Sequence, residues 1–210
     1  GEEIARFDHA TALEVLAFEP IRALGGGTPH SSEIRSAVEA DPFPLAMASG
    51  DLDGDGAIDL VVGYGTGESG RLEIHSGNPE IRLPPAARSD RAAPSPFQGP
   101  PVVVPVPLRP EVVLVGDFQG DGLRDVLVAR RGGFEMVLLP GAGDRRPGPA
   151  RTIALEGAVT AMAAGEFDVP DGLTDLVVGI TDAAGPRMLL FRSSLGALRA
   201  PAESIELPAA

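Results

Sequence analysis

The feature that most constrains the fold of this chain is an acidic, glycine-rich loop that occurs three times, each copy followed by a short apolar run. The copies read GDLDGDGAIDLVVG at 50–63, GDFQGDGLRDVLVA at 116–129 and GEFDVPDGLTDLVVG at 165–179. A motif that recurs every few tens of residues indicates that one structural unit is repeated along the chain. The apolar runs are short and rich in Val, so they predict strands rather than helices.

The acids of the first copy stand at alternate positions, a spacing that suits a hard metal ion. Positions 1, 3, 5 and 9 carry carboxylates, and position 7 offers a backbone carbonyl; these residues are Asp51, Asp53, Asp55, Asp59 and, at position 7, Ala57. Ca²⁺ takes about six to eight oxygen ligands, whereas Mg²⁺ demands a stricter octahedron. The loop contains no Cys or His, which disfavours zinc and copper. The pattern therefore predicts calcium, and its repetition weakens the alternative of a solvated Asp-Gly turn.

The other two copies depart from this pattern. The second keeps Asp117, Asp121 and Asp125 but has Gln119 at position 3, whose carbonyl oxygen can still bind a metal. The third has one extra residue, and its acids are Glu166, Asp168, Asp171 and Asp175. We expect up to three Ca²⁺ ions, with the first site binding best and the third worst.

A helix–loop–helix calcium site is the main alternative, and position 12 argues against it. That site needs a bidentate Glu at position 12, but Val62 and Val128 stand there in the first two copies. Because the residues that follow each loop predict a strand, we expect the loop to join two strands.

Four strands are predicted around each loop, in the same order each time. The predicted strands are 43–49, 58–62, 71–75 and 102–106, then 111–115, 124–129, 134–139 and 151–155, then 159–164, 174–180, 187–191 and 204–207. Repeated four-stranded antiparallel units are typical of the blades of a β-propeller. The sequence therefore predicts an all-β chain with three full blades plus a partial one, which closes a small ring by itself or forms part of a larger propeller.

The domain boundaries follow from these units. Residues 1–40 predict the end of a preceding blade or a blade without a loop, residues 41–110 a first full blade, and residues 111–157 and 158–210 the next two. Residues 79–100 are rich in Pro and predict a surface loop inserted in the first full blade.

The loop-and-strand motif resembles the FG-GAP repeats of integrin α-subunits and the related VCBS-type repeats of bacterial surface and secreted proteins, and the resemblance covers about 30–210. It implies a β-propeller that binds Ca²⁺ in the loop between the first two strands of a blade. The implied ligands are Asp51, Asp53, Asp55, the Ala57 carbonyl and Asp59, then Asp117, Gln119, Asp121, the Leu123 carbonyl and Asp125, then Glu166, Asp168, Asp171 and Asp175. In this family the metal is structural, and partners bind elsewhere.

Composition limits the partners and the compartment. A net charge of −13 disfavours nucleic acid. No apolar run reaches about 18 residues, so no membrane span is expected. Calcium sites of extracellular modules bind at roughly 10⁻⁴–10⁻³ M, which favours an extracellular, cell-surface or periplasmic location.

The leading interpretation is a non-catalytic, calcium-stabilised module that recognises a protein or a glycan. One alternative is a propeller enzyme, a hydrolase or lyase acting on polysaccharide. The only histidines of the chain are His9, His30 and His75, and none of them lies in a nucleophile motif. The other alternative is a structural subunit of a larger assembly, whose other chains or blades complete the propeller.

Overall fold

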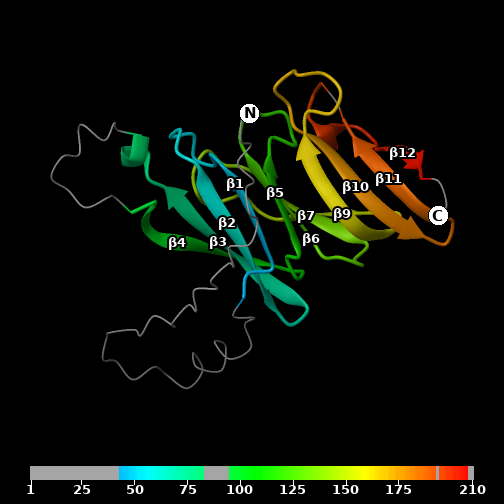
Figure 1. Ribbon diagram of the computed structural model, residues 1–210, viewed down its shortest axis with the longest axis horizontal. Helices are drawn as coiled ribbons and strands as arrows, with labels where there is room; N and C mark the ends of the chain where they lie inside the picture. The colour runs from blue at the N-terminus through cyan, green and yellow to red at the C-terminus, as the bar shows by residue number, and fades with distance from the viewer. Residues whose placement is uncertain (1–42, 83–94, 193, 208–210) are drawn as a thin grey trace, which may run out of the picture.

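The computed structural model describes residues 43–82, 95–192 and 194–207, which form three four-stranded antiparallel sheets and almost no helix (Figure 1). Sheet A contains β1 (Ala46–Gly50), β2 (Asp59–Thr66), β3 (Ser69–Gly77) and β4 (Phe97–Val106). Sheet B contains β5 (Val112–Gly116), β6 (Asp125–Ala129), β7 (Glu135–Leu139) and β8 (Arg151–Ala154). Sheet C contains β9 (Ala158–Gly165), β10 (Asp175–Asp182), β11 (Gly185–Phe191) and β12 (Glu203–Glu206). The 3₁₀ turns are η1 (Pro79–Arg82) and η3 (Ala197–Arg199).

The prediction of an all-β chain built from four-stranded antiparallel units is confirmed. In every sheet, each strand pairs with the next one along the chain. The described sheets lie in an open row and do not close into a ring. The predicted partial blade at residues 1–40 lies outside the described residues.

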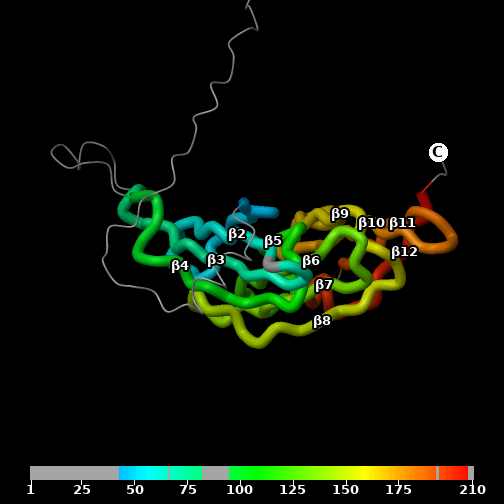
Figure 2. The backbone as a smooth tube through the Cα atoms, turned by 90° about the horizontal axis from the view of Figure 1, so that it is seen from below, coloured from blue at the N-terminus to red at the C-terminus, as the bar shows by residue number. Residues whose placement is uncertain are grey.

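Sheet B is the middle layer, and Figure 2 shows it between sheets A and C. Successive side chains along its strands point alternately into two cores. Val126 and Val128 of β6 pack into the core shared with sheet A, whereas Leu127 and Ala129 pack into the core shared with sheet C. Because successive side chains of a strand point to opposite faces, a strand buried on both faces needs an unbroken apolar run. This explains why the residues after the second loop are all apolar.

Adjacent sheets approach each other closely at the glycines that precede the first two acidic loops. A Cβ added at Gly50 would lie 2.5 Å from Val115 Cγ1 of sheet B, and one added at Gly116 would lie 2.6 Å from Thr174 Cγ2, just before β10 of sheet C. At the equivalent Gly165 the nearest atom, in the ring of Phe167, is 3.5 Å away. The repeated glycine therefore allows close stacking between sheets A and B and between B and C.

The Pro-rich segment departs from the prediction. Residues 79–82 form η1, residues 83–94 lie outside the described part of the chain, and β4 begins at Phe97, inside the predicted surface loop. Prolines are tolerated here because β4 is an edge strand. The register with β3 shifts between Ile74 and Ser76, and Gly99 adopts φ 64° within this irregular stretch. The bulge is what lets a Gly-Pro-Pro sequence remain in the strand.

We expect Gly116→Ala to lower the free energy of unfolding by about 1–3 kcal/mol, because the new methyl group would overlap Thr174. Thr174 cannot simply turn away, since its hydroxyl oxygen accepts a hydrogen bond from Asp117 N at 3.1 Å. Gly165→Ala is the matched control and should leave the stability unchanged or slightly raised. Urea denaturation of both variants measures this, and equal losses would contradict the close stacking of sheets B and C.

Candidate metal centre

Each acidic loop joins the first strand of its sheet to the second, as predicted. The loops connect β1 to β2, β5 to β6 and β9 to β10. Each loop thus leaves the end of an edge strand and returns along its antiparallel neighbour, so the three loops occupy equivalent places in the three sheets. Their internal hydrogen bonds can therefore be compared position by position.

The last aspartate of every loop is buried and holds the start of the loop. Asp59 accepts a hydrogen bond from Leu52 N at 2.8 Å, and Asp125 accepts one from Phe118 N at 3.0 Å. Asp175 accepts the corresponding bond from Phe167 N at 2.8 Å. The other oxygens of Asp59 and Asp125 accept from Gly77 N, the last residue of β3, and from Gly141 N, just beyond β7, both at 2.8 Å. This carboxylate therefore ties the loop to the sheet in each repeat.

The first aspartate shapes the turn of the loop from inside. Asp51 accepts hydrogen bonds from Gly54 N at 2.8 Å and from Gly56 N at 2.9 Å. Both glycines adopt positive φ, 74° and 83°, a backbone conformation that residues other than glycine rarely adopt. The second loop repeats this arrangement around Asp117, with Gly120 and Gly122 at φ 68° and 84°. The glycines therefore let the backbone wrap around the first carboxylate.

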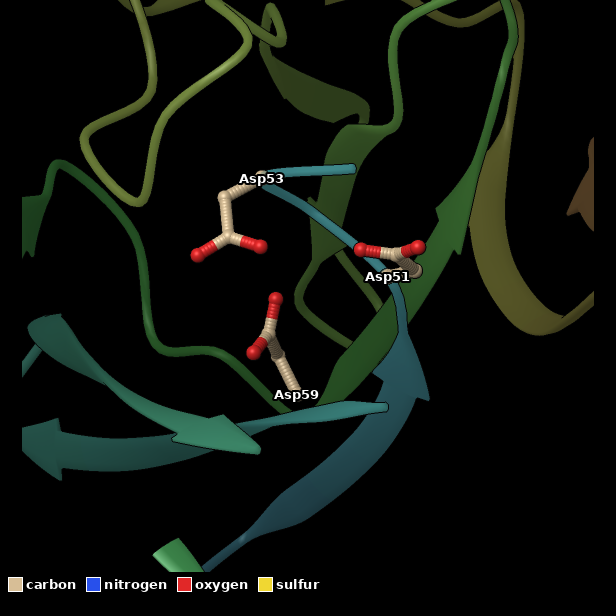
Figure 3. Close-up of side chains that lie close together, drawn as sticks. All are labelled: Asp51, Asp53 and Asp59. Carbon is tan, nitrogen blue, oxygen red and sulfur yellow. The ribbon is translucent and has the colours of Figure 1, made fainter. Parts of the chain in front are cut away.

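In the first loop these constraints bring three carboxylates together. Ligand oxygens of Asp51, Asp53 and Asp59 all lie within 4.8 Å of one another. Figure 3 shows the carboxylates of Asp53 and Asp59 pointing toward each other, with that of Asp51 beside them. Asp55 is exposed, and its Oδ1 accepts a hydrogen bond from Ala57 N at 2.6 Å. The triad could hold a metal ion, because converging carboxylate oxygens are the donors that hard cations take.

An arginine from the neighbouring sheet reaches the triad. Arg145, in the connection between β7 and β8, places Nε 3.4 Å from Asp53 Oδ2 and donates from Nη1 to the Ser76 hydroxyl at 2.9 Å. A guanidinium is always charged, so it offsets part of the repulsion among the three acids. The first loop is thus in contact with sheet B through an ion pair.

Burial raises the pKa of Asp59 above its ordinary value of 3.8. The backbone N–H groups of Gly77 and Leu52 oppose this shift, and the nearby charges of Asp53 and Asp55 add to it. A cation between the carboxylates would favour the charged form of Asp59. Burial likewise raises the pKa of Asp125.

The second and third loops do not bring their acids together in this way. Within residues 43–82, 95–192 and 194–207, the triad of the first loop is the only group of three acids, histidines or cysteines whose ligand atoms converge within 4.8 Å. In the second loop Gln119 Nε2 donates to Asp125 Oδ1 at 3.2 Å, and Asp121 Oδ1 accepts from Leu123 N at 3.0 Å.

In the third loop the acids face backbone and an arginine. Asp171 Oδ1 accepts a hydrogen bond from Leu173 N at 2.9 Å, and Glu166 is exposed. Asp168 lies 3.5 Å from the guanidinium of Arg192. Position 3 of every loop therefore contacts an arginine: Arg145 at the first, Arg151 at the second and Arg192 at the third. Nothing in the loop motif signals these contacts, because the arginines stand far from the loops in sequence.

His75, one of the three histidines considered for catalysis, lies on β3. Its Nε2 is 3.8 Å from Glu73, and its ring packs at 5.4 Å against Phe97. The adjacent Ser76 hydroxyl accepts the hydrogen bond from Arg145 described above. His9 and His30 lie outside the described residues.

Comparison with protein-family models gives no match, and comparison with curated proteins gives none either. The likeness to FG-GAP and VCBS-type repeats therefore remains a resemblance carried by the loop motif. Within the part of the chain that the structure describes, no helix has the length and apolar character needed to cross a membrane.

We expect Ca²⁺ to lower the pKa of Asp59, which can be measured by ¹³C NMR of the carboxyl carbons with and without metal. Without metal, the raised pKa means that protonated Asp59 contributes to the stability of the folded state. This contribution is fully present below pH 3.8 and is lost as the pH rises through the folded-state pKa of Asp59. Asp182 is the control, because a hydrogen bond from Ala184 N at 2.8 Å lowers its pKa at the far end of β10. An Asp59 pKa that does not respond to Ca²⁺ would contradict a metal site in the first loop.

Proposed function

We propose that this chain is a calcium-stabilised β-propeller module of an extracellular or cell-surface protein that recognises a protein or glycan partner. The observation that carries the proposal is the convergence of Asp51, Asp53 and Asp59 at the connection between the first and second strands of sheet A. The metal would hold the loop and the strands it joins, and it would serve structure rather than catalysis.

The choice of calcium rests on the donor set. All three converging groups are carboxylates, and the neighbouring Asp55 and the backbone carbonyl of Ala57 offer further oxygens. Ca²⁺ accepts such a flexible set of oxygen ligands, whereas Mg²⁺ keeps several waters and needs near-octahedral geometry. The ordinary affinity of extracellular calcium modules also fits the proposed location.

The propeller arrangement is supported by a pattern that runs through successive sheets. The first strands of neighbouring sheets are in contact, β1 with β5 and β5 with β9. The residue at position 2 of the first two loops packs toward the next sheet: Leu52 is 6% exposed in the core of sheets A and B, and Phe118 is 0% exposed in the core of sheets B and C. The equivalent Phe167 is 50% exposed, which fits a further sheet packed against sheet C.

The partner would bind away from the metal loops. A hollow of about 310 Å³ lies at the opposite end of sheets A and B, lined by residues that include Glu68, Arg130 and Phe134. Arg130 forms an ion pair with Glu68 across the two sheets, and the Phe134 side chain is exposed. An exposed aromatic ring beside charged hydrogen-bonding groups suits either a sugar or a protein side chain.

The calcium proposal predicts that a chelator lowers the melting temperature and that added Ca²⁺ restores it. Metal bound only by the folded state stabilises it by about 2.7 kcal/mol at a hundredfold excess over Kd, which corresponds to a shift of about 5–10 °C for a chain of this size. Asp55→Ala should remove most of this difference, because the resemblance implies Asp55 as a further ligand of the metal in the first loop. Calorimetry in Ca²⁺ and in chelator measures the difference.

The control variant is Asp182→Ala. Like Asp55, Asp182 accepts a hydrogen bond from the N–H two residues later, but it lies at the other end of sheet C. This variant should melt lower in both buffers while keeping the full difference between them. A wild-type protein that melts at the same temperature with Ca²⁺ and with chelator would rule out the calcium proposal.

A second candidate function, a structural subunit of a larger assembly, is favoured by the outer face of sheet C. The register of its strands turns Val177, Leu190, Met188 and Ile205 away from the core shared with sheet B. The pairing also places one charged residue, Glu203, opposite Leu190 on this mainly apolar face, and Ile205 is 38% exposed. Apolar sheet faces of this kind ordinarily pack against another layer.

The assembly candidate predicts a molar mass above 21.6 kDa in solution. Met188→Glu should return the protein to a monomer, because it places a charge on the outer face of sheet C without entering the core shared with sheet B. Light scattering after gel filtration measures both masses. A wild-type protein that is monomeric at all concentrations would contradict this second candidate.

A further inference from the structure

We propose that the second acidic loop, residues 116–125, keeps its shape without a metal ion, because the carboxamide of Gln119 and two arginines occupy the role that a cation takes in the first loop. This inference rests on the proposed metal site of the first loop. It assigns different chemistry to two loops that share most of their sequence.

The orientation of the Gln119 carboxamide follows from its partners. Arg151 donates a hydrogen bond to Gln119 Oε1, and a guanidinium has donors only. The oxygen must therefore face Arg151, and the amide nitrogen must face Asp125, to whose Oδ1 it donates at 3.2 Å. The carbonyl oxygen that the resemblance implies as a metal ligand is thus turned away from the carboxylate that would share the metal.

The Asp125 carboxylate is more fully hydrogen-bonded than its counterpart in the first loop. Its Oδ1 accepts from Gln119 Nε2 and from Gly141 N, and its Oδ2 accepts from Phe118 N. Asp59 accepts one backbone hydrogen bond on each oxygen and faces two further carboxylates. An amide donor therefore stands at Asp125 where the first loop presents acids, and a buried carboxylate that is already satisfied by donors does not need a cation.

The connection between β11 and β12 also contacts the second loop from outside. Arg199 Nε donates to the Gln119 carbonyl oxygen at 3.0 Å, and Leu198 N donates to the Phe118 carbonyl oxygen at 2.9 Å. A Cβ added at Gly120 would lie 2.5 Å from the carbonyl oxygen of Leu195. The loop is therefore fixed by backbone contacts and by the charges of Arg151 and Arg199, which offset those of its three acids.

The second loop also lacks a converging triad of acids, because its position 3 is Gln119. Asp117, Asp121 and Asp125 do not form a group with ligand atoms within 4.8 Å of one another, whereas the acids at positions 1, 3 and 9 of the first loop do. The residue at position 3 thus determines whether the loop holds a metal ion or keeps its shape without one. Asp53 supplies a third carboxylate to the first loop, and Gln119 supplies a hydrogen-bond donor to the second.

The first experiment counts bound Ca²⁺ by isothermal titration and equilibrium dialysis of the full chain with two matched variants, Asp55→Ala and Asp121→Ala. Both residues are exposed and accept a hydrogen bond from the N–H two residues later. We expect Asp55→Ala to weaken Ca²⁺ binding at least tenfold and Asp121→Ala to leave both the number of ions and the affinity unchanged. Loss of one bound ion in Asp121→Ala would overturn the inference.

The second experiment compares the two residues at position 3 by melting. Gln119→Ala should lower the melting temperature by at least about 3 °C, equally in Ca²⁺ and in chelator, because it removes hydrogen bonds that need no metal. Asp53→Ala should lower it mainly in Ca²⁺. A Gln119→Ala effect that appears only in Ca²⁺ would show that the second loop does bind metal.

The two proposals fail in different ways. If the wild-type protein binds no Ca²⁺ at all, the proposed function is wrong, yet a Gln119→Ala loss that is equal in both buffers still supports the metal-free second loop. If the wild-type protein binds Ca²⁺ and Asp121→Ala removes an ion, the proposed function stands and this inference is wrong.

Discussion

The hydrogen bond between the last aspartate of each loop and the backbone at the start of that loop is the interaction on which the rest of the structure depends. Asp59, Asp125 and Asp175 are all buried, and each closes its loop in the same way. A carboxylate buried without donors would cost several kcal/mol, so the loop backbone must fold back to satisfy it. The closed loop then returns the chain as a second strand antiparallel to the first, and in the first two loops it places position 2 against the next sheet.

The three loops share this aspartate–backbone hydrogen bond, but the contacts inside each loop differ. In the first, Asp51, Asp53 and Asp59 converge and leave room for a cation. In the second, Gln119 and Arg151 fill the corresponding role with hydrogen bonds. In the third, an inserted residue and the contact of Asp168 with Arg192 separate the acids. The repeat therefore conserves the tie between loop and sheet, while the residue at position 3 and its arginine partner determine the chemistry inside.

Much of the fold could be predicted because it depends on local pattern. Alternation and β-branched runs predict strands, and three loops at equivalent positions predict three equivalent sheets. The start of β4 at Phe97 could not be predicted, since only an edge position and a bulge allow its prolines to remain in a strand. The contacts of Arg145 and Arg151 with the loops could not be predicted either, because they depend on how the chain stacks and turns far from each loop. Whether a ring closes depends on what lies against sheet C, and no local pattern determines that.

Native-state hydrogen exchange, followed by NMR amide by amide, tests the central claim most directly. The amides of Leu52 and Phe118 should exchange slowly with and without metal, because buried aspartates hold them. Added Ca²⁺ should slow exchange at Gly54 and Gly56 in the first loop and leave Gly120 and Gly122 in the second unchanged. Rapid exchange at Leu52 and Phe118, or equal slowing of both pairs of glycines by Ca²⁺, would contradict a shared aspartate frame with a metal site in the first loop and a metal-free second loop.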